Sequence, residues 1–176
     1  MTKNLTCDAS TLRDMSKLKL LSHLHKLGYS LHTTSLACKG LDDATRFEVE
    51  ALTATGLITI DKSNEKDYPA FLRMRQDNPG ISRSDCSVIF LAWRMKYKLI
   101  TSDPYVINVA SKVNVTAVKY SFVFGEMAAS GLLTLAEATE KYMELTTEVN
   151  TLCDLGHQVI HLPMVTYSFI NKQSAG

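Results

Sequence analysis

Short apolar runs alternate along this chain with longer segments in which apolar residues recur every three or four positions. The short runs predict strands at residues 4–7, 29–34, 57–60, 98–101 and 113–118. The longer segments predict helices, because that spacing places the apolar side chains on one side of a helix. Strands that alternate with helices are typical of an α/β fold, here a three-layer α/β/α sandwich with a central, mostly parallel sheet.

The helical segments are bounded by residues that commonly start or end helices. The predicted helices cover residues 11–27, 35–55, 64–76, about 82–95, one that starts at Pro104, and two separated by Gly131. The second helix is either continuous or broken at Gly40, and the fourth begins after Ser82 or Ser84. This fourth helix is apolar on nearly every side, which predicts deep burial. In the tail at 156–176, residues 159–162 fit either a short strand or part of a helix.

Composition places the chain among ordinary globular domains. Its 176 residues are 45% apolar and 21% charged, which suits a single domain with a sizeable core. The formal net charge is only +1, so binding to nucleic acid would require a local basic patch. The four cysteines are dispersed without a C-x-x-C pair, which argues against a zinc knuckle and favours reduced thiols. No apolar stretch approaches the roughly 20 residues of a membrane helix and no signal-peptide core is present, so we expect a cytoplasmic protein without membrane contact.

Three aspartates stand where apolar runs begin or end. Asp8 follows the first predicted strand, Asp103 follows the strand at 98–101, and Asp85 opens the most apolar helix. Because the carboxyl ends of parallel strands meet at one edge of a sheet, we expect these side chains to lie close together. Carboxylates gathered in this way repel one another unless a cation binds them. The pattern therefore predicts a Mg²⁺ or Mn²⁺ site, since hard divalent ions select oxygen ligands.

Each aspartate also has a structural interpretation. Asp8 and Asp103 stand at positions that suit helix N-caps. Asp85 would need a partner in an apolar helix, and Arg83 or a backbone amide would serve. The occurrence of all three together favours the metal site, because perturbed acids cluster at functional sites. In that case the hydroxyls of Ser10 and Thr101 would orient the ligands through hydrogen bonds.

Four stretches, taken in order, resemble the sequence pattern of PIN domains. LTCDAS at residues 5–10 is similar to the opening strand of that family, and SRSDCSVIFLA at 82–92 is similar to its central S-x-x-D-x-S helix. LITSD at 99–103 resembles the T-x-D strand end, and residues 115–134 resemble the C-terminal pattern of the family. The resemblance covers about residues 4–145 of a single domain at 1–176, and leaves a C-terminal extension at about 146–176.

The resemblance implies a function as well as a fold. PIN domains of this type are typically Mg²⁺- or Mn²⁺-dependent ribonucleases, and many are the toxin of a toxin–antitoxin pair. By that resemblance, Asp8, Asp85 and Asp103 would bind the metal ion and catalyse hydrolysis of RNA phosphodiester bonds. RNA would be the substrate, an antitoxin would be a protein partner, and a homodimer would be consistent with the family.

One position departs from the family pattern. PIN domains usually carry a glutamate at the start of the helix after the second strand, and here that position falls on Gly40. Asp43 and Glu48 are the nearest candidates for the missing acid. Without a fourth acid the affinity for metal falls, so the alternative is a degenerate, non-catalytic PIN-like module that binds a protein or nucleic acid. A nucleotide-handling α/β protein with one Mg²⁺ is a third interpretation, although the chain has no phosphate-binding loop.

Overall fold

The computed structural model describes residues 3–62 and 65–153 of the chain. By its internal contacts the chain divides into two units, Met1–Tyr142 and Met143–Gly176. The division lies close to the predicted boundary between the core and the C-terminal extension. The sheet and both sites described below belong to the first unit, and the predictions for residues 156–176 fall outside the described residues.

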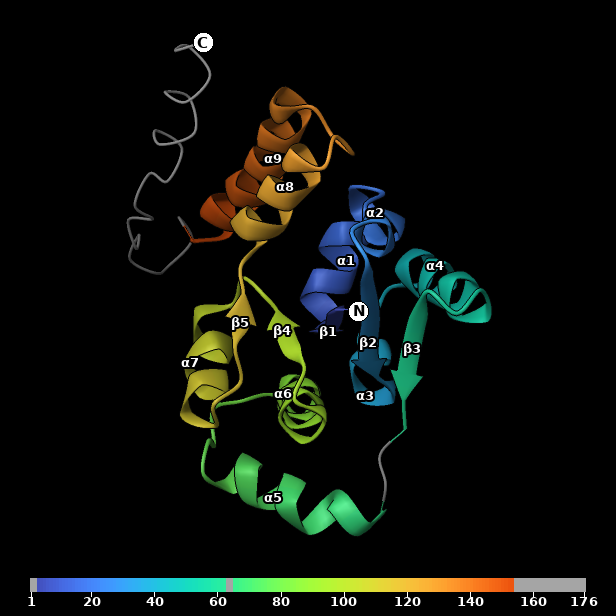
Figure 1. Cartoon of the computed structure of the whole chain (residues 1–176). Helices are drawn as coiled ribbons and strands as arrows, with labels where there is room; N and C mark the ends of the chain where they lie inside the picture. Colours follow the sequence, from blue (N-terminus) through green and yellow to red (C-terminus); the bar gives the residue numbers. More distant parts are fainter. Residues whose placement is uncertain (1–2, 63–64, 154–176) are drawn as a thin grey trace. The chain divides into compact units, whose positions relative to one another are not determined.

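The first unit is built on one five-stranded parallel sheet with the order β3-β2-β1-β4-β5 (Figure 1). Its strands are β1 (Lys3–Cys7), β2 (Tyr29–Thr34), β3 (Ile58–Asp61), β4 (Lys98–Ile100) and β5 (Ala117–Val118). Leu5 of β1 stands opposite Leu31 of β2 on one side and Lys98 of β4 on the other. From β1 the chain builds the sheet in one direction through β2 and β3, then crosses to β4 and β5 on the opposite side. The carboxyl ends of β1 and β4 therefore flank the point where the strand order reverses, which is where ligands bind in such sheets.

Helices cover the sheet in two groups, which confirms the three-layer α/β/α fold. The first group contains α1 (Ala9–Lys17), α2 (Leu21–Lys26) and α4 (Asp43–Ala54), and the second contains α3 (Ser35–Cys38), α5 (Tyr68–Gln76), α6 (Arg83–Met95) and α7 (Pro104–Lys112). In the first group α1 packs on α2 and α4, while in the second α6 packs on α3, α5 and α7 (Figure 1). A short 3-10 helix (Glu65–Asp67) precedes α5, and α8 (Tyr120–Ala129) and α9 (Leu135–Cys153) follow the last strand. Helix α9 crosses the division between the two units.

A large part of the core lies between the sheet and α6. Every residue from Cys86 to Ala92 is buried, which confirms the deep burial predicted for this helix. Helix α6 packs against β1, β2 and β4, so it lies across the middle of the sheet. Its first turn is thereby held near the carboxyl ends of the central strands, because the helix runs back against parallel strands. Among the described residues, no helix is both long enough and apolar enough to cross a membrane.

Three predicted elements are shorter than the sequence pattern suggested. The predicted helix at 11–27 is interrupted at Lys19, which has φ of 60° and leaves two helices in place of one. The predicted helix at 35–55 takes the second of its two predicted forms, with a break near Gly40, so that α3 ends at Cys38 and α4 begins at Asp43. The strand predicted at 113–118 comprises only Ala117–Val118, although Val115 is also buried. Apolar spacing indicates which residues are buried, but it does not indicate where the regular backbone hydrogen bonding of a helix or strand ends.

Candidate functional site

Asp8 connects β1 to α1 at the carboxyl edge of the sheet. Its side chain is 1% exposed, and its Oδ1 accepts hydrogen bonds from the Thr11 amide at 2.7 Å and the Ser10 hydroxyl at 2.8 Å. The second carboxylate oxygen, Oδ2, is buried and has no hydrogen-bond partner among the described residues. Leaving a buried polar atom unpaired costs about 1–3 kcal/mol, and more for a charged group. The N-cap role therefore explains one oxygen of Asp8 and leaves the other unexplained.

Asp103 occupies the equivalent place after β4. Its Oδ1 accepts hydrogen bonds from the amides of Tyr105 at 2.7 Å and Val106 at 3.2 Å, so it caps α7. The amide of Asp103 donates to the hydroxyl of Thr101 at 3.2 Å, and Thr101 is fully buried. Thr101 thus fixes the backbone from which the Asp103 carboxylate projects.

Asp85 lies in the first turn of α6. Ser82, the N-cap, donates its hydroxyl to Asp85 Oδ2 at 2.6 Å and accepts a hydrogen bond from the Asp85 amide at 3.0 Å. Burial raises the pKa of the Asp85 carboxyl, and the negative charges of Asp8 and Asp103 raise it further. The Ser82 hydrogen bond and the positive charge of Arg13 act in the opposite direction without reversing the shift.

The electrostatic effects on the pKa of Asp85 indicate that the three acids lie near one another. Asp8 and Asp103 act on Asp85 electrostatically, although the three residues are far apart in the sequence. Within residues 3–62 and 65–153, however, no group of three or more His, Cys, Asp or Glu side chains is arranged to hold a metal ion. The fold thus brings the three charges within electrostatic range, and each carboxylate is engaged with a local hydrogen-bond donor.

The chemistry of these residues fits a hard divalent cation. The available donors are carboxylate and hydroxyl oxygens, which Mg²⁺ and Mn²⁺ prefer. The buried Oδ2 of Asp8 supplies an acceptor that no described residue satisfies. A cation would also relieve the repulsion that raises the pKa of Asp85.

The two residues proposed to replace the missing glutamate lie elsewhere. The side chain of Asp43 is 99% exposed and forms an ion pair with Arg46 on α4. Glu48 accepts a hydrogen bond from Ser16, at the far end of α1 from Asp8. Eight residues of helix separate Ser16 from Asp8, which is about 12 Å. The position of Gly40 is therefore not filled by either candidate.

Two further residues at this site were not predicted from the sequence. Tyr120, at the start of α8, donates its hydroxyl proton to Asp14 at 2.8 Å, and its hydroxyl oxygen also lies within hydrogen-bond distance of the Thr11 hydroxyl at 3.2 Å. Burial raises the pKa of the Tyr120 hydroxyl, with further contributions from the charges of Asp14 and Asp8. Arg13, on the exposed side of α1, contributes positive charge near Asp85. The only signal for Arg13 was its place five residues after Asp8 on the same predicted helix, and the sequence carried none for Tyr120.

Comparison with known proteins assigns no family to the chain. A scan against models of protein families gave no match, and a search of curated proteins gave none either. Among solved structures, the chain is similar to one described as "Crystal structure of PAE2754 from Pyrobaculum aerophilum". The two are 15% identical with a TM-score of 0.48, and the match covers 73% of this chain and 99% of that one.

Proposed function

We propose that this protein is a Mg²⁺- or Mn²⁺-dependent ribonuclease with its active site at the carboxyl ends of β1 and β4. The observation that carries the proposal is the buried Oδ2 of Asp8, which no residue in the described part of the chain satisfies, at the point where the strand order reverses. The electrostatic effect of Asp8 and Asp103 on Asp85 supports it, as does the resemblance of the sequence to PIN domains. By the same resemblance, the protein would act as the toxin of a toxin–antitoxin pair and would form a homodimer; a cytoplasmic location is proposed from the lack of a signal-peptide core in the sequence.

In this proposal the protein residues have distinct roles. Asp8, Asp85 and Asp103 would hold the ion, while Ser10 would orient the Asp8 carboxylate and Thr101 the backbone of Asp103. The ion would supply a lowered pKa for water and would offset the charge that develops on the phosphodiester. Arg13 is placed to balance the negative charge of the site when no cation is bound.

Calorimetric titration with Mn²⁺ tests the proposal. The wild-type protein should bind Mn²⁺, and Asp85→Asn should lose binding because one charged ligand is removed. Asp43→Asn is the matched control, since it removes an equal charge from an exposed position outside the site. A mixed pool of single-stranded RNA should be cleaved by wild type and Asp43→Asn, and left intact by Asp85→Asn. Absence of Mn²⁺ binding at millimolar concentration, together with intact RNA, would contradict the assignment.

The second candidate is a PIN-like module that does not cleave RNA. Two observations favour it: Asp43 and Glu48 are engaged away from Asp8, and no three metal-binding side chains are preassembled among the described residues. Such a module would bind a protein or nucleic acid through the same edge of the sheet. Mn²⁺ binding without cleavage of any RNA in the pool would support this candidate over the nuclease.

A further inference from the structure

A cavity lies between α5, α6 and the carboxyl ends of β2 and β3. It has a volume of about 80 Å³, enough for several water molecules or roughly one six-membered ring. The residues of α6 that line it include Arg83, Ser87, Phe90 and Arg94. These are spaced three or four positions apart and therefore share one side of the helix, whereas Asp85 is two positions from both Arg83 and Ser87 and faces another direction. The cavity is thus separate from the acidic site.

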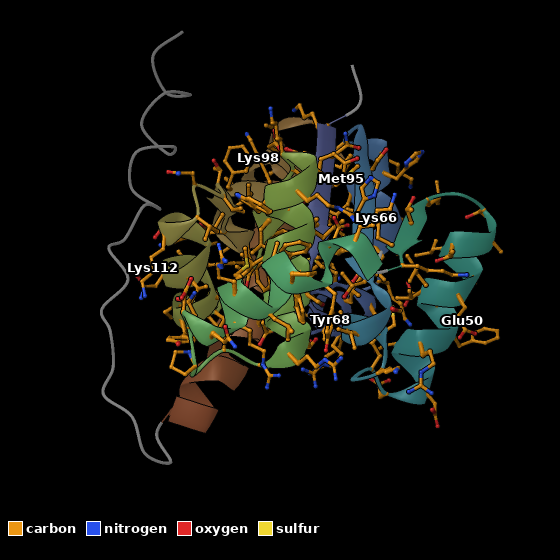
Figure 2. All side chains as sticks on the ribbon, turned by 90° about the horizontal axis from the view of Figure 1, so that it is seen from below. Glu50, Lys66, Tyr68, Met95, Lys98 and Lys112 are labelled. Atoms are coloured by element: carbon orange, nitrogen blue, oxygen red, sulfur yellow. The ribbon has the colours of Figure 1, made fainter. Side chains whose placement is uncertain are left out.

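One wall of this cavity is aromatic. Phe71 and Phe90 meet edge to face with ring centroids 5.9 Å apart, and Tyr68 lies 6.2 Å from Phe71 in a stacked arrangement. Phe71 and Phe90 are each 8% exposed, while Tyr68 is 47% exposed at the mouth. Figure 2 looks onto this side of the protein and places Tyr68 near the centre of the view, on α5. A row of rings that is buried at one end and open at the other accommodates a flat aromatic group by stacking.

The polar side chains around the aromatic wall give the cavity an excess of positive charge. Three cationic side chains line it, against two carboxylates. Both carboxylates already have partners, since Asp67 forms an ion pair with Arg94 and Asp61 Oδ2 lies 3.3 Å from the His32 ring. Arg83 and Lys62 are exposed beside the opening, where they attract an anionic group.

Arg94 adds an unsatisfied donor inside the cavity. Its guanidinium contacts Asp67 through one terminal nitrogen, while its Nε is buried and has no hydrogen-bond partner among the described residues. A ligand with a ring nitrogen or carbonyl oxygen would supply the missing acceptor. The cavity therefore combines a stacking surface, a buried donor and cations at its mouth.

We propose that this cavity binds a nucleoside monophosphate unit, with the base against Tyr68, Phe71 and Phe90 and the phosphate at Arg83 and Lys62. The unit is either a free nucleotide or the phosphorylated end of an RNA strand, since both present the same base and phosphate. Binding here requires neither a metal ion nor hydrolysis, so it does not depend on the function proposed for the acidic site.

The single tryptophan of the chain provides a signal for binding. Trp93 lies beside the cavity, with its ring centroid 5.5 Å from that of Phe90. Titration with uridine monophosphate, whose base is a single six-membered ring, should change Trp93 fluorescence and reach saturation. Uridine without phosphate and inorganic phosphate should each bind on the order of tenfold more weakly than the monophosphate, because each satisfies only half of the site.

Paired variants separate the two halves of the site. Tyr68→Ala should weaken binding of both uridine and its monophosphate on the order of tenfold. Arg83→Gln should weaken the monophosphate to a similar extent and leave uridine unchanged. Phe122→Ala, which removes a ring that is 52% exposed on α8, is the control for Tyr68→Ala. Lys112→Gln is the charge control, because Lys112 lies away from Tyr68 at the left of the view in Figure 2.

Two further measurements identify the source of the ligand and test nucleotide binding independently of the metal site. A short RNA with a 5′-phosphate that binds more tightly than the free monophosphate would identify a strand end, and the reverse order would identify a free nucleotide. Asp85→Asn should bind nucleotide like wild type, so the metal site can fail without affecting this result. Absence of saturable binding at millimolar nucleotide, or equal binding by wild type, Tyr68→Ala and Arg83→Gln, would overturn the proposal.

Discussion

Replacement of Asp85 by Asn should stabilise the metal-free protein while removing its response to metal. The pKa of Asp85 lies above its ordinary value of 3.8, so the folded protein holds the proton more tightly than the unfolded chain does. The ionised form is therefore disfavoured in the folded state at neutral pH. Asn keeps an oxygen for the Ser82 hydroxyl and removes the charge that Asp8 and Asp103 repel.

The size of this gain in the free energy of unfolding depends on how deeply the Asp85 side chain is buried. The side chain is only partly buried, so solvent screens its interaction with Asp8 and Asp103. Asn also loses a favourable interaction of about 0.3–1 kcal/mol between a negative charge and the N-terminus of α6. We expect a net gain of about 0.5–1 kcal/mol, which raises the melting temperature by roughly 1–4 °C for a chain of this length.

The dependence of stability on pH tests whether the charge of Asp85 destabilises the folded protein. The destabilisation by Asp85 is absent below its unfolded pKa of 3.8 and is complete once the pH exceeds its raised folded pKa. The advantage of Asp85→Asn over wild type should therefore grow as the pH rises from about 4 through the raised folded pKa of Asp85, and should then level off. It should also shrink as salt is added, because the repulsion between carboxylates is screened.

Thermal melting followed by circular dichroism measures both halves of the prediction. In chelator, Asp85→Asn should melt above wild type. With Mn²⁺ at about 100 times its dissociation constant, wild type should gain about 2.7 kcal/mol, or roughly 5–11 °C, and Asp85→Asn should gain nothing. The reasoning is refuted if Asp85→Asn melts below wild type in chelator at neutral pH, or if Mn²⁺ raises both melting temperatures equally.

Three other predictions concern individual side chains. Tyr120→Phe removes hydrogen bonds to Asp14 and Thr11 and should lower the free energy of unfolding by about 1–3 kcal/mol in urea; no change would mean that these bonds contribute nothing net. Lys96→Gly should raise the free energy of unfolding by about 0.5–1 kcal/mol, because Lys96 ends α6 with φ of 56°, a left-handed conformation that glycine adopts without strain. A loss of stability in the same assay would contradict this. Burial raises the pKa of the fully buried Cys7 thiol, so a thiol reagent should label Cys7 only after unfolding, and mass spectrometry of the labelled native protein would reveal any earlier reaction.

The parts of the fold that depend on local pattern were predictable from the sequence. Strand β2 has the predicted bounds of 29–34, and α6 ends at Met95 after the N-cap Ser82, one of the two caps considered. The break at Lys19 was not predictable, because the leucine spacing continues across it and lysine has no preference for positive φ. Strand β5 was overestimated since Val115 is buried in the loop before the strand, and apolar character alone does not distinguish the two.

The candidate site was predictable only as far as the strand ends were. Asp8 and Asp103 follow β1 and β4, and parallel strands necessarily bring such residues to one edge of the sheet. The contact between Tyr120 and Asp14 joins residues that are 106 positions apart, and nothing in either segment indicates the other. The cavity between α5 and α6 was missed for the same reason, because its aromatic wall is shared by two helices that each look like ordinary core elements.

Capping and metal binding are compatible roles for these aspartates, so the observation of caps does not by itself decide the function. A cap uses one carboxylate oxygen: both hydrogen bonds to Asp103 from α7 reach Oδ1, and both bonds to Asp8 also reach Oδ1. An aspartate that served only as a cap would gain from exposing its second oxygen to water, yet Asp8 buries Oδ2 with no partner in residues 3–62 and 65–153. Burial of that oxygen beside two further acids raises the free energy of the metal-free protein, and a cation would offset it. In the proposed site, Gly40 would weaken the hold on such a cation, because neither Asp43 nor Glu48 supplies the fourth carboxylate.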